Sequence, residues 1–427
     1  MSQILYITHN GIVDHIGQSQ IAPYCMGLAE RGYSIHVVSA EKPGGEALKE
    51  RYRKLFAERG IKWSHVTYHN RPPLVSQFYD VVRMRRLALR IAARERPQLV
   101  HCRSYLPILI GAAVKRKFGA KLLIDFRHFW VEAGLEDSPY KFVYRAFKKF
   151  EPGWFAAADH VVALTRKAAG ILNSWYPSKQ GLDRFTVIPC CADFEHFNLK
   201  RVKPQEVAEL RARLSFGERD FVLLYLGSIG PDYLLGEMMR LFGELLALRP
   251  DAKFLFVSNN GREQVEQTRD AFGIAPEAVR FVNASRDEIP TYLALTDLSV
   301  FFYRPDLSRA GCSPTKLAEL LAANVPVIGN TNVGDLDTIL SPQRNCSVVV
   351  KDFEPATMRR ALQQVLAVDP AERSRIRGNS QEYTLEAGVE RYASIYRRFV
   401  PGVEKQPVVQ AGVTHPETAA VAAAAQC

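Results

Sequence analysis

Short apolar runs alternate with longer amphipathic stretches along the first 190 residues. The first two runs are residues 4–8 and 35–39, and between them a helix is expected over 18–31, ending at Gly32. A strand, a helix and a second strand in this order indicate parallel pairing, because parallel strands need a crossover connection. Runs of the same kind recur at residues 99–101, 121–125, 160–164 and 186–189.

A charged helical segment at residues 205–214 interrupts this pattern, and a second series of apolar runs then begins. Its runs are residues 221–225, 253–257, 279–282, 298–302, 326–328 and 347–350. The sequence therefore predicts an α/β protein with two Rossmann-like, doubly wound parallel-sheet domains facing a cleft. Ligands of such sheets bind beyond the carboxyl ends of the strands.

The expected boundaries follow from these two series. Residues 1–200 form the first domain and residues 201–384 the second. A helix within 385–402 packs back on the first domain, and residues 403–427, rich in Ala, Val and Gln, are expected to be disordered.

The composition adds constraints on class and location. Apolar residues make up 47% of the chain, which is enough for a core in each half, yet they form no membrane-length run. The first residues lack the features of a signal peptide, so we expect a cytoplasmic protein. The seven cysteines include no Cys-x-x-Cys pair and predict neither disulfides nor a zinc site.

The net charge of +11 favours anionic partners. Because no nucleic-acid-binding motif is present, nucleotide phosphates or acidic lipids are the better candidates. Two stretches, residues 81–96 and 141–150, mix cations with apolar residues. Each is either a solvated helix face or a contact with an anionic membrane surface. The cations expected on one helical stripe are Arg83, Arg86, Arg90 and Arg94.

The segment 313–319 has the signature of a helix that begins at an anion. Ser313 is a suitable N-cap and Pro314 a suitable first residue, and the free N–H groups of the first turn favour a diphosphate. Lys316 would add a positive charge, while Glu319 would reach ribose hydroxyls one turn along. The alternative is an ordinary capped helix with an exposed pair between Lys316 and Glu319.

Glycine-containing turns follow the first strand of each series. Gly227 and Ser228 come after residues 221–225, where a glycine would let the backbone approach a ligand. Gly17 lies in the loop 11–20, which lacks the G-x-G-x-x-G fingerprint of dinucleotide-binding proteins. An ordinary strand-to-helix turn is the alternative in both places.

A third cluster follows the run 121–125. Asp125, Arg127 and His128 would face the cleft from the carboxyl end of that strand. Arg103, Ser104 and Tyr105 follow the preceding strand and are therefore expected nearby, on the acceptor side. The alternative is a salt-bridged loop without chemistry.

The ordered set of these motifs resembles the GT-B glycosyltransferases of the large retaining family 4, the glycosyl transferases group 1. The matching pieces, over about residues 1–400, are Gly17-Gln18-Ser19-Gln20, Asp125-x-Arg127-x-Phe129-Trp130, residues 158–162, residues 187–193, Gly227-Ser228, residues 313–316, residues 319–322 and residues 326–328.

The resemblance implies how a donor would bind. Lys316 would contact the diphosphate together with the helix start that contains Ser313 and Thr315, and Glu319 would contact the ribose. Gly227 and Ser228 would lie at the phosphates, with Gly17 approaching from the other domain, and the base would rest near Asn283. No catalytic metal or other cofactor is implied, because fixed positive groups would stabilise the leaving diphosphate.

Two positions depart from the family pattern. Gly311 stands where the family usually has the first of two glutamates, which leaves the role beside the donor sugar vacant or moved. Asn324 replaces a glycine before the strand 326–328, and asparagine tolerates the left-handed conformation expected there.

The predicted function is transfer of a sugar, with retention, from a nucleotide diphosphate sugar to a glycan or lipid-linked acceptor in cell-surface polysaccharide biosynthesis. The catalytic candidates are Asp125, Arg127, His128 and Lys316. The alternatives are a nucleotide-sugar epimerase of the same fold and a non-catalytic nucleotide-binding subunit. A cytoplasmic location, peripheral on the inner face of the plasma membrane, would suit a lipid-linked acceptor.

Overall fold

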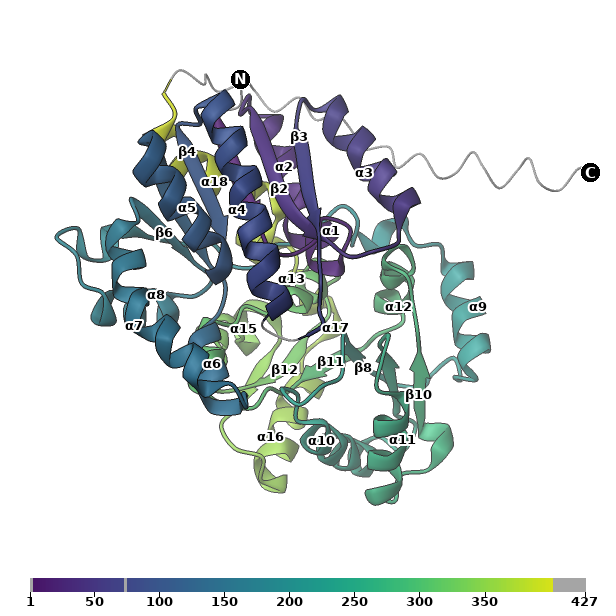
Figure 1. The fold of residues 1–427 in the computed structure, drawn as a ribbon. Helices are drawn as coiled ribbons and strands as arrows, with labels where there is room; N and C mark the ends of the chain where they lie inside the picture. Colours follow the sequence, from purple (N-terminus) through teal and green to yellow (C-terminus); the bar gives the residue numbers. More distant parts are fainter. Residues whose placement is uncertain (1–2, 73–74, 402–427) are drawn as a thin grey trace, which may run out of the picture.

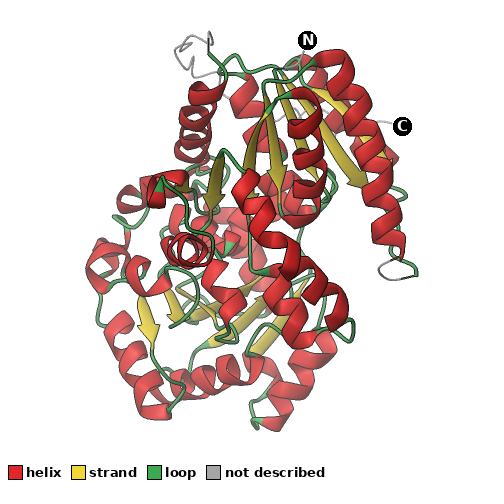
Figure 2. Cartoon of the chain, turned by 60° about the vertical axis from the view of Figure 1, so that its left-hand side comes forward, coloured by secondary structure: helices red, strands yellow, loops and turns green. Residues whose placement is uncertain are grey.

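The computed structural model describes residues 3–72 and 75–401, and in this part of the chain two parallel sheets form the two halves of the molecule (Figure 1). The first sheet has the order β3-β2-β1-β4-β5-β6-β7 and the second the order β10-β9-β8-β11-β12-β13. All of their pairings are parallel, and helices cover both faces of each sheet (Figure 2). The α/β fold expected from the sequence is confirmed.

The strands are short, as expected for buried parallel sheets. The first sheet contains β1 (Ile4–Thr8), β2 (Ile35–Glu41), β3 (Lys62–Thr67), β4 (Leu99–Arg103), β5 (Lys121–Phe126), β6 (His160–Ala163) and β7 (Phe185–Val187). The second contains β8 (Val222–Leu226), β9 (Lys253–Val257), β10 (Val279–Val282), β11 (Leu298–Phe301), β12 (Val327–Asn330) and β13 (Val348–Val350).

The α-helices connect these strands. Those of the first half are α1 (His15–Gln20), α2 (Ala22–Ala29), α3 (Glu46–Glu58), α4 (Val75–Glu95), α5 (Tyr105–Phe118), α6 (Trp130–Asp137), α7 (Lys141–Ala157) and α8 (Arg166–Trp175). The later ones are α9 (Pro204–Leu214), α10 (Leu235–Leu248), α11 (Arg262–Ala271), α12 (Ile289–Ala294), α13 (Thr315–Ala322), α14 (Leu336–Ile339), α15 (Pro342–Asn345), α16 (Pro355–Leu366), α17 (Pro370–Arg373) and α18 (Leu385–Phe399).

Short 3-10 helices complete the connections. They are η1 (Gly181–Arg184), η2 (Leu199–Arg201), η3 (Pro276–Ala278), η4 (Arg286–Glu288), η5 (Leu307–Gly311) and η6 (Gly378–Tyr383).

The helix expected over residues 18–31 is wrong in one respect, because the structure divides it at Ile21. This residue has φ −127° and ψ −63°, which is not helical, and α2 begins after it. Pro23 explains the break, since a proline lacks the N–H group that a continuous helix needs and its ring clashes with the carbonyl four residues earlier. The edge strand β3 and helix α3 were not predicted.

Helix α18 returns from the second half and packs against the first (Figure 1). Tyr392 lies edge-on to Tyr24, and Tyr396 lies edge-on to Tyr33. The hydroxyl of Tyr396 lies 2.7 Å from Nδ1 of His101 in β4. The predicted disordered tail, 403–427, lies outside the described residues.

Direct hydrogen bonds join the two halves around the start of α8. The carboxylate of Asp335 accepts hydrogen bonds from the backbone N–H groups of Arg166 at 2.7 Å and Lys167 at 3.1 Å. The hydroxyl of Thr165 donates to the carbonyl of Ala310 at 2.7 Å. A carboxylate at a helix N-terminus is favourable, so Asp335 holds the halves together as well as capping α8.

Among residues 3–72 and 75–401, none of the helices has the length and apolar character required to span a bilayer. The cysteines of these residues are free thiols: Cys25, Cys102, Cys190, Cys191 and Cys346 are buried, and Cys312 is half-buried.

Candidate functional site

The ammonium group of Lys316 is buried among aromatic rings. Lys316 is the second residue of α13 and is only 8% exposed. Its Nζ lies 4.3 Å from the ring centre of Tyr225 and 4.6 Å from that of Tyr233, and the rings of Phe301 and Tyr303 lie within 5.9 Å. Cation–π attraction therefore holds the side chain in an aromatic box.

Within the described residues this Nζ has no hydrogen-bond partner. Burial lowers the pKa of Lys316 to about 7, and the neighbouring Cys312 and Glu319 only partly oppose that shift. The ammonium thus lacks the anion that a buried cation ordinarily requires. An incoming anion would supply this partner and favour the protonated form.

Gly227 lies directly beside this ammonium. A Cβ atom at Gly227 would come within 3.0 Å of Lys316 Nζ, and the backbone there has φ +119°, so only glycine fits without strain. Ser228 is exposed next to it, and its carbonyl accepts a hydrogen bond from the Tyr225 hydroxyl at 2.5 Å. The structure therefore brings Gly227 and Lys316 together.

The expected N-cap of α13 is wrong. Pro314 occupies the N-cap position, and no side chain caps the helix. Ser313 is instead turned toward the other half, where its Oγ accepts a hydrogen bond from the backbone N–H of Cys190 at 3.1 Å. Because the Ser313 hydroxyl is bonded to Cys190, the first N–H groups of α13 have no side-chain cap. Thr315, the first residue of α13, is half-buried.

Glu319 lies one turn further along α13 and pairs with Arg286, not with Lys316. Its Oε1 is 3.4 Å from a guanidinium nitrogen of Arg286, and its side chain is 13% exposed. Burial raises the pKa of Glu319, while Arg286 opposes the shift. Asn283, exposed after β10, lies three residues before Arg286 in the same connection. The exposed pair between Lys316 and Glu319 that the alternative, an ordinary capped helix, would carry is thus not formed.

A buried cluster of charges lies at the carboxyl ends of β4 and β5. Asp125 is fully buried and lies 3.1 Å from Arg103 and 3.2 Å from Arg127. Nε2 of His101 lies 3.5 Å from the same carboxylate. Burial alone would raise the pKa of Asp125, but Arg127, His101 and Arg103 hold it well below its usual range. Asp125 is therefore a permanent anion that positions both guanidinium groups.

Arg127 connects this cluster to the second half. A guanidinium N–H of Arg127 lies 3.4 Å from the Sγ of Cys190, the residue whose backbone N–H reaches Ser313. His128, the next residue, is exposed to the space between the halves. Although its side chain is exposed to this space, desolvation by the protein packed around it lowers the pKa of His128 to about 4, with a further contribution from Arg309 and Arg127. At neutral pH its imidazole is uncharged.

The residues expected on the acceptor side are mostly enclosed. Arg103 is 4% exposed in the Asp125 cluster, and Tyr105 is 2% exposed with its hydroxyl donating to Glu151 at 2.6 Å. Tyr105 therefore does not face the cleft, contrary to the prediction, because the first turn of α5 points it into the core. Ser104 is half-buried, with φ +70°.

Gly17 makes its close approach within its own loop. A Cβ there would collide with the carbonyl oxygens of Gly11 and Ile12, so α1 can pack on this loop only with a glycine. Glu41 anchors the loop from β2 by accepting a hydrogen bond from the N–H of Ile12 at 2.7 Å.

Gly311 is buried between the two halves. A Cβ there would lie 3.3 Å from the Cα of His128 and 3.2 Å from the ring of Phe129. A larger side chain would press on the loop that follows β5, which is a steric reason for glycine. Asn324 has φ +56°, the left-handed conformation expected for it.

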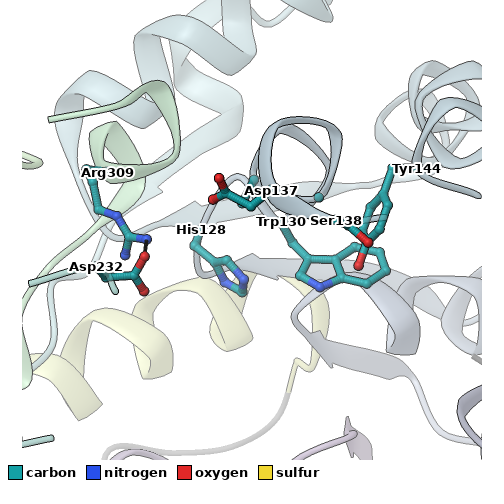
Figure 3. A pocket seen from close by; sticks show the side chains of 9 residues that line it. His128, Trp130, Asp137, Ser138, Tyr144, Asp232 and Arg309 are labelled. Atoms are coloured by element: carbon teal, nitrogen blue, oxygen red, sulfur yellow. Dashed lines mark ion pairs between the residues drawn. The ribbon is translucent and has the colours of Figure 1, made fainter. Parts of the chain in front are cut away.

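Sequence reasoning missed Asp232 and Arg309, which form an ion pair of 2.5 Å and line a pocket between the two halves (Figure 3). Asp232 follows the glycine turn after β8, and Arg309 lies in η5, just before α13. Asp232 could have been proposed from the sequence, because it lies beyond the carboxyl end of β8. No local sequence signal identifies Arg309, because its ion-pair partner, Asp232, lies 77 positions earlier.

Among the described residues, no group of three or more His, Cys, Asp or Glu side chains is arranged to hold a metal ion.

Comparisons with known proteins agree with this geometry. The model of the Glycosyltransferase Family 4 matches residues 21–196, and that of the Glycosyl transferases group 1 matches residues 220–367. A search of curated protein sequences gives no match.

Solved structures share the fold over nearly the whole chain. A glycosyltransferase from Rickettsia africae has a TM-score of 0.68 at 14% identity, covering 94% of this chain and 99% of that one. Anabaena HepE in complex with UDP-glucose has a TM-score of 0.65 at 14% identity, covering 92% and 99%. WaaG, a glycosyltransferase involved in lipopolysaccharide biosynthesis, has a TM-score of 0.63 at 14% identity, covering 93% and 100%.

The fold and the site thus define a GT-B glycosyltransferase, with two parallel-sheet halves facing each other. The two family models each cover one half of the molecule, so the family assignment rests on both halves. The chain belongs to the glycosyltransferases of family 4, the group 1 class, and the resemblance inferred from its motifs is confirmed.

Proposed function

We propose that this glycosyltransferase takes its sugar from a nucleotide diphosphate sugar. The observation that carries the proposal is the buried ammonium of Lys316, which has no hydrogen-bond partner in the described residues and lies beside Gly227. A diphosphate would give this cation a counter-charge, with the uncapped N–H groups of α13 as further donors. The complex of Anabaena HepE with UDP-glucose supports this choice of donor.

In this proposal the rest of the nucleotide extends along α13. Ser313, Thr315 and Ser228 lie with Gly227 at the phosphates, and Gly17 belongs to the facing loop. Glu319 contacts the ribose, since a buried carboxylate beside Arg286 can accept hydroxyl hydrogen bonds without facing the phosphates. The base lies near Asn283.

The proposed reaction proceeds with retention and without a metal ion or other cofactor. Negative charge develops on the leaving diphosphate, and Lys316 with the start of α13 stabilises it. His128 is uncharged at neutral pH, so it would offer a hydrogen bond at the reacting centre and no positive charge. Asp125 acts through Arg127, because its carboxylate is occupied by two guanidinium groups.

We further propose a glycan or lipid-linked acceptor at the inner face of the plasma membrane, in cell-surface polysaccharide assembly. WaaG, which is involved in lipopolysaccharide biosynthesis, supports this class of acceptor. On α7, Phe142 and Phe150 are 66% and 61% exposed, and Arg145 and Lys149 are exposed between them. Exposed aromatics among cations suit an anionic lipid surface.

Donor binding is tested by thermal shift and calorimetry with a panel of nucleotide diphosphates and their sugars. The nucleotide diphosphate with the matching base should raise the melting temperature, since a ligand that binds only the native state stabilises it by RT ln(1 + [L]/Kd), where [L] is the free ligand concentration. Lys316→Met should abolish the shift, whereas Lys351→Met, a matched change at an exposed lysine of the same half, should preserve it. A shift retained in Lys316→Met would contradict the proposal.

Retention is tested on the product. The anomeric configuration of the transferred sugar, measured by proton NMR before it equilibrates, should equal that of the donor. An inverted product would refute this part of the proposal.

Membrane contact is tested by sedimentation with vesicles. Binding should be stronger with vesicles containing phosphatidylserine than with phosphatidylcholine alone. The double variant Phe142→Ser and Phe150→Ser should lose it. Phe272→Ser removes a 40% exposed phenylalanine from the other half and serves as the control. Equal binding of both variants would contradict a contact through α7.

A further inference from the structure

The turn that follows β8 is held by a side chain from another connection, the one between β9 and α11. This side chain is the amide of Asn260, which makes two hydrogen bonds to the backbone of a single residue, Ile229. Its Nδ2 donates to the carbonyl of Ile229 at 2.7 Å, and its Oδ1 accepts from the N–H of Ile229 at 3.1 Å. Only this orientation of the amide satisfies both backbone groups, so Asn260 fixes the turn in position and in direction.

The neighbours of Asn260 in the sequence support this contact. The hydroxyl of Ser258, which is buried, donates to the carbonyl of Asn260 at 2.8 Å and lies 3.3 Å from its Oδ1. Gly261 has φ +85°, and a Cβ atom there would lie 2.7 Å from the Cβ of Ile229. The connection can therefore approach the turn this closely only with a glycine at this position.

The turn held in this way is the one that lies beside the ammonium in the aromatic box. Gly227, whose missing side chain makes room for that ammonium, donates its N–H to the carbonyl of Val257 at the end of β9, at 3.0 Å. Ile229, two residues later, is 4% exposed and bonded to Asn260. The exposed Ser228 thus lies between two anchors, one on β9 and one on Asn260.

We infer that Asn260 is a positioning residue of the sugar transfer, which holds Gly227 and Ser228 where the donor diphosphate is proposed to bind. This inference rests on the proposed function. Groups that stabilise a developing charge must be fixed before the reaction, because small displacements weaken their effect strongly. A side chain that only stabilised the fold would affect the binding of every ligand alike. A residue that positions the phosphate turn affects phosphate binding selectively.

The test compares binding of a nucleoside diphosphate with binding of the nucleoside that lacks its phosphates. Calorimetry with UDP, GDP, ADP and CDP on the full chain identifies the best diphosphate, and saturation-transfer NMR measures its nucleoside. Asn260→Asp keeps the acceptor but replaces the donor with an oxygen facing the Ile229 carbonyl. Diphosphate affinity should fall about tenfold, the value of about one net hydrogen bond, while nucleoside affinity stays unchanged. Asn259→Asp adds the same charge at the exposed neighbouring residue and should preserve both affinities.

A second variant disturbs the same turn without changing Asn260. Gly261→Ala places a methyl group against Ile229, and it should also weaken diphosphate binding selectively. Gly273→Ala is its matched control, because Gly273 has φ +63° but no atom within 4 Å of a Cβ there. Both alanines meet similar backbone strain, so only the contact with the turn differs between them. Melting temperatures of all four variants show whether the fold is intact.

Two results would overturn the inference. One is a diphosphate affinity of Asn260→Asp equal to that of Asn259→Asp. The other is a parallel loss of diphosphate and nucleoside affinity in Asn260→Asp or Gly261→Ala, which would indicate a purely structural role. Failure of the proposed function is distinguishable from both, because the unaltered protein would then bind none of the four nucleoside diphosphates.

Discussion

The two halves of the molecule treat buried charge in opposite ways. In the second half, the ammonium of Lys316 is surrounded by aromatic rings and has no hydrogen bond in the described residues. In the first half, the carboxylate of Asp125 is held by Arg103, Arg127 and His101. Both groups are almost inaccessible to solvent, so the difference lies in their partners and not in their depth.

The two charges therefore have different roles: Asp125 stabilises the structure of the protein, whereas Lys316 is free to pair with a bound anion. The Asp125 cluster has its counter-ions built in, and its geometry is fixed before any substrate arrives. Lys316 has only polarisable rings, which stabilise a cation without neutralising it. A buried cation in that state gains much from an anion and little from water.

The largest effect is expected when the charge of Asp125 is removed from its ion-paired cluster. Asp125→Asn would leave two buried guanidinium groups without their shared carboxylate, and we expect the free energy of unfolding to fall by about 3–5 kcal/mol. Urea denaturation measures it. Asp270→Asn removes a 63% exposed carboxylate beside Arg269 and should change stability by less than about 1 kcal/mol. Equal losses in the two variants would show that the cluster is not specially stabilising.

The second-largest effect is expected when the unpaired charge of Lys316 is removed. Lys316→Met keeps an apolar chain in the aromatic box but no charge, so turnover should fall by about 10²–10³-fold, as for loss of one donor to a developing anion. Circular dichroism and melting temperature should show an intact fold, in contrast to Asp125→Asn. Steady-state kinetics beside Lys351→Met provide the measurement, and turnover within twofold of normal would contradict the proposed role.

The pH dependence of Lys316 gives a smaller and more specific effect. With a pKa of about 7 in the folded protein against an ordinary 10.5, Lys316 binds fewer protons folded than unfolded between these values. Its contribution to stability therefore rises as pH increases from about 7 toward 10. Diphosphate affinity should move oppositely, falling about tenfold per pH unit above 7 as the free protein loses the proton.

Calorimetry at several pH values measures that slope, and buffers of different ionisation enthalpy measure the proton taken up on binding. The Lys316→Met protein should show neither this pH dependence of the affinity nor this proton uptake on binding. A diphosphate affinity independent of pH between 7 and 9 would indicate that Lys316 stays charged in the empty protein.

The smallest effect concerns Arg286, which lies beside Glu319 where the ribose is proposed to bind. Arg286→Gln removes the partner of Glu319 from a pair that is 36% exposed on the arginine side, so stability should change by less than about 1 kcal/mol. The KM for the donor should rise about two- to threefold while kcat stays near normal, because ribose contacts are present in ground and transition states alike. Arg262→Gln, at a 58% exposed arginine, is the control. A fall in kcat alone would place Arg286 at the reacting centre instead.

Most of the fold could be predicted from periodicity. Buried strands such as residues 4–8 and 253–257 were recognisable because a parallel sheet needs continuous apolar runs. Helix α18, residues 385–399, lies within the range 385–402 in which a helix was expected. The break at Ile21 was not expected, although Pro23 was visible, since a proline is tolerated in the first turn of a helix and does not by itself fix where one helix ends.

The site could be predicted only in part. Gly227 and Lys316 were both identified from turns and helix starts, which are local signals, and the structure places them together. The pairings of Ser313 with Cys190 and of Asp232 with Arg309 were missed, because each joins residues far apart in the sequence. Tyr105 was misplaced because helix phase, which decides whether a residue faces cleft or core, could not be fixed at the start of α5.

The sequence alone determined the alternation of strands and helices, and hence two parallel sheets. A strand that is buried on both faces must consist mainly of apolar residues, which can be recognised in the sequence. It also placed glycine, lysine and serine at the carboxyl ends of those strands. Only the tertiary structure decided which charges have partners: the aromatic rings around Lys316 come from β8, from the connection after it and from the region of β11. Electrostatic environment depends on distance in space, which the chain order does not contain.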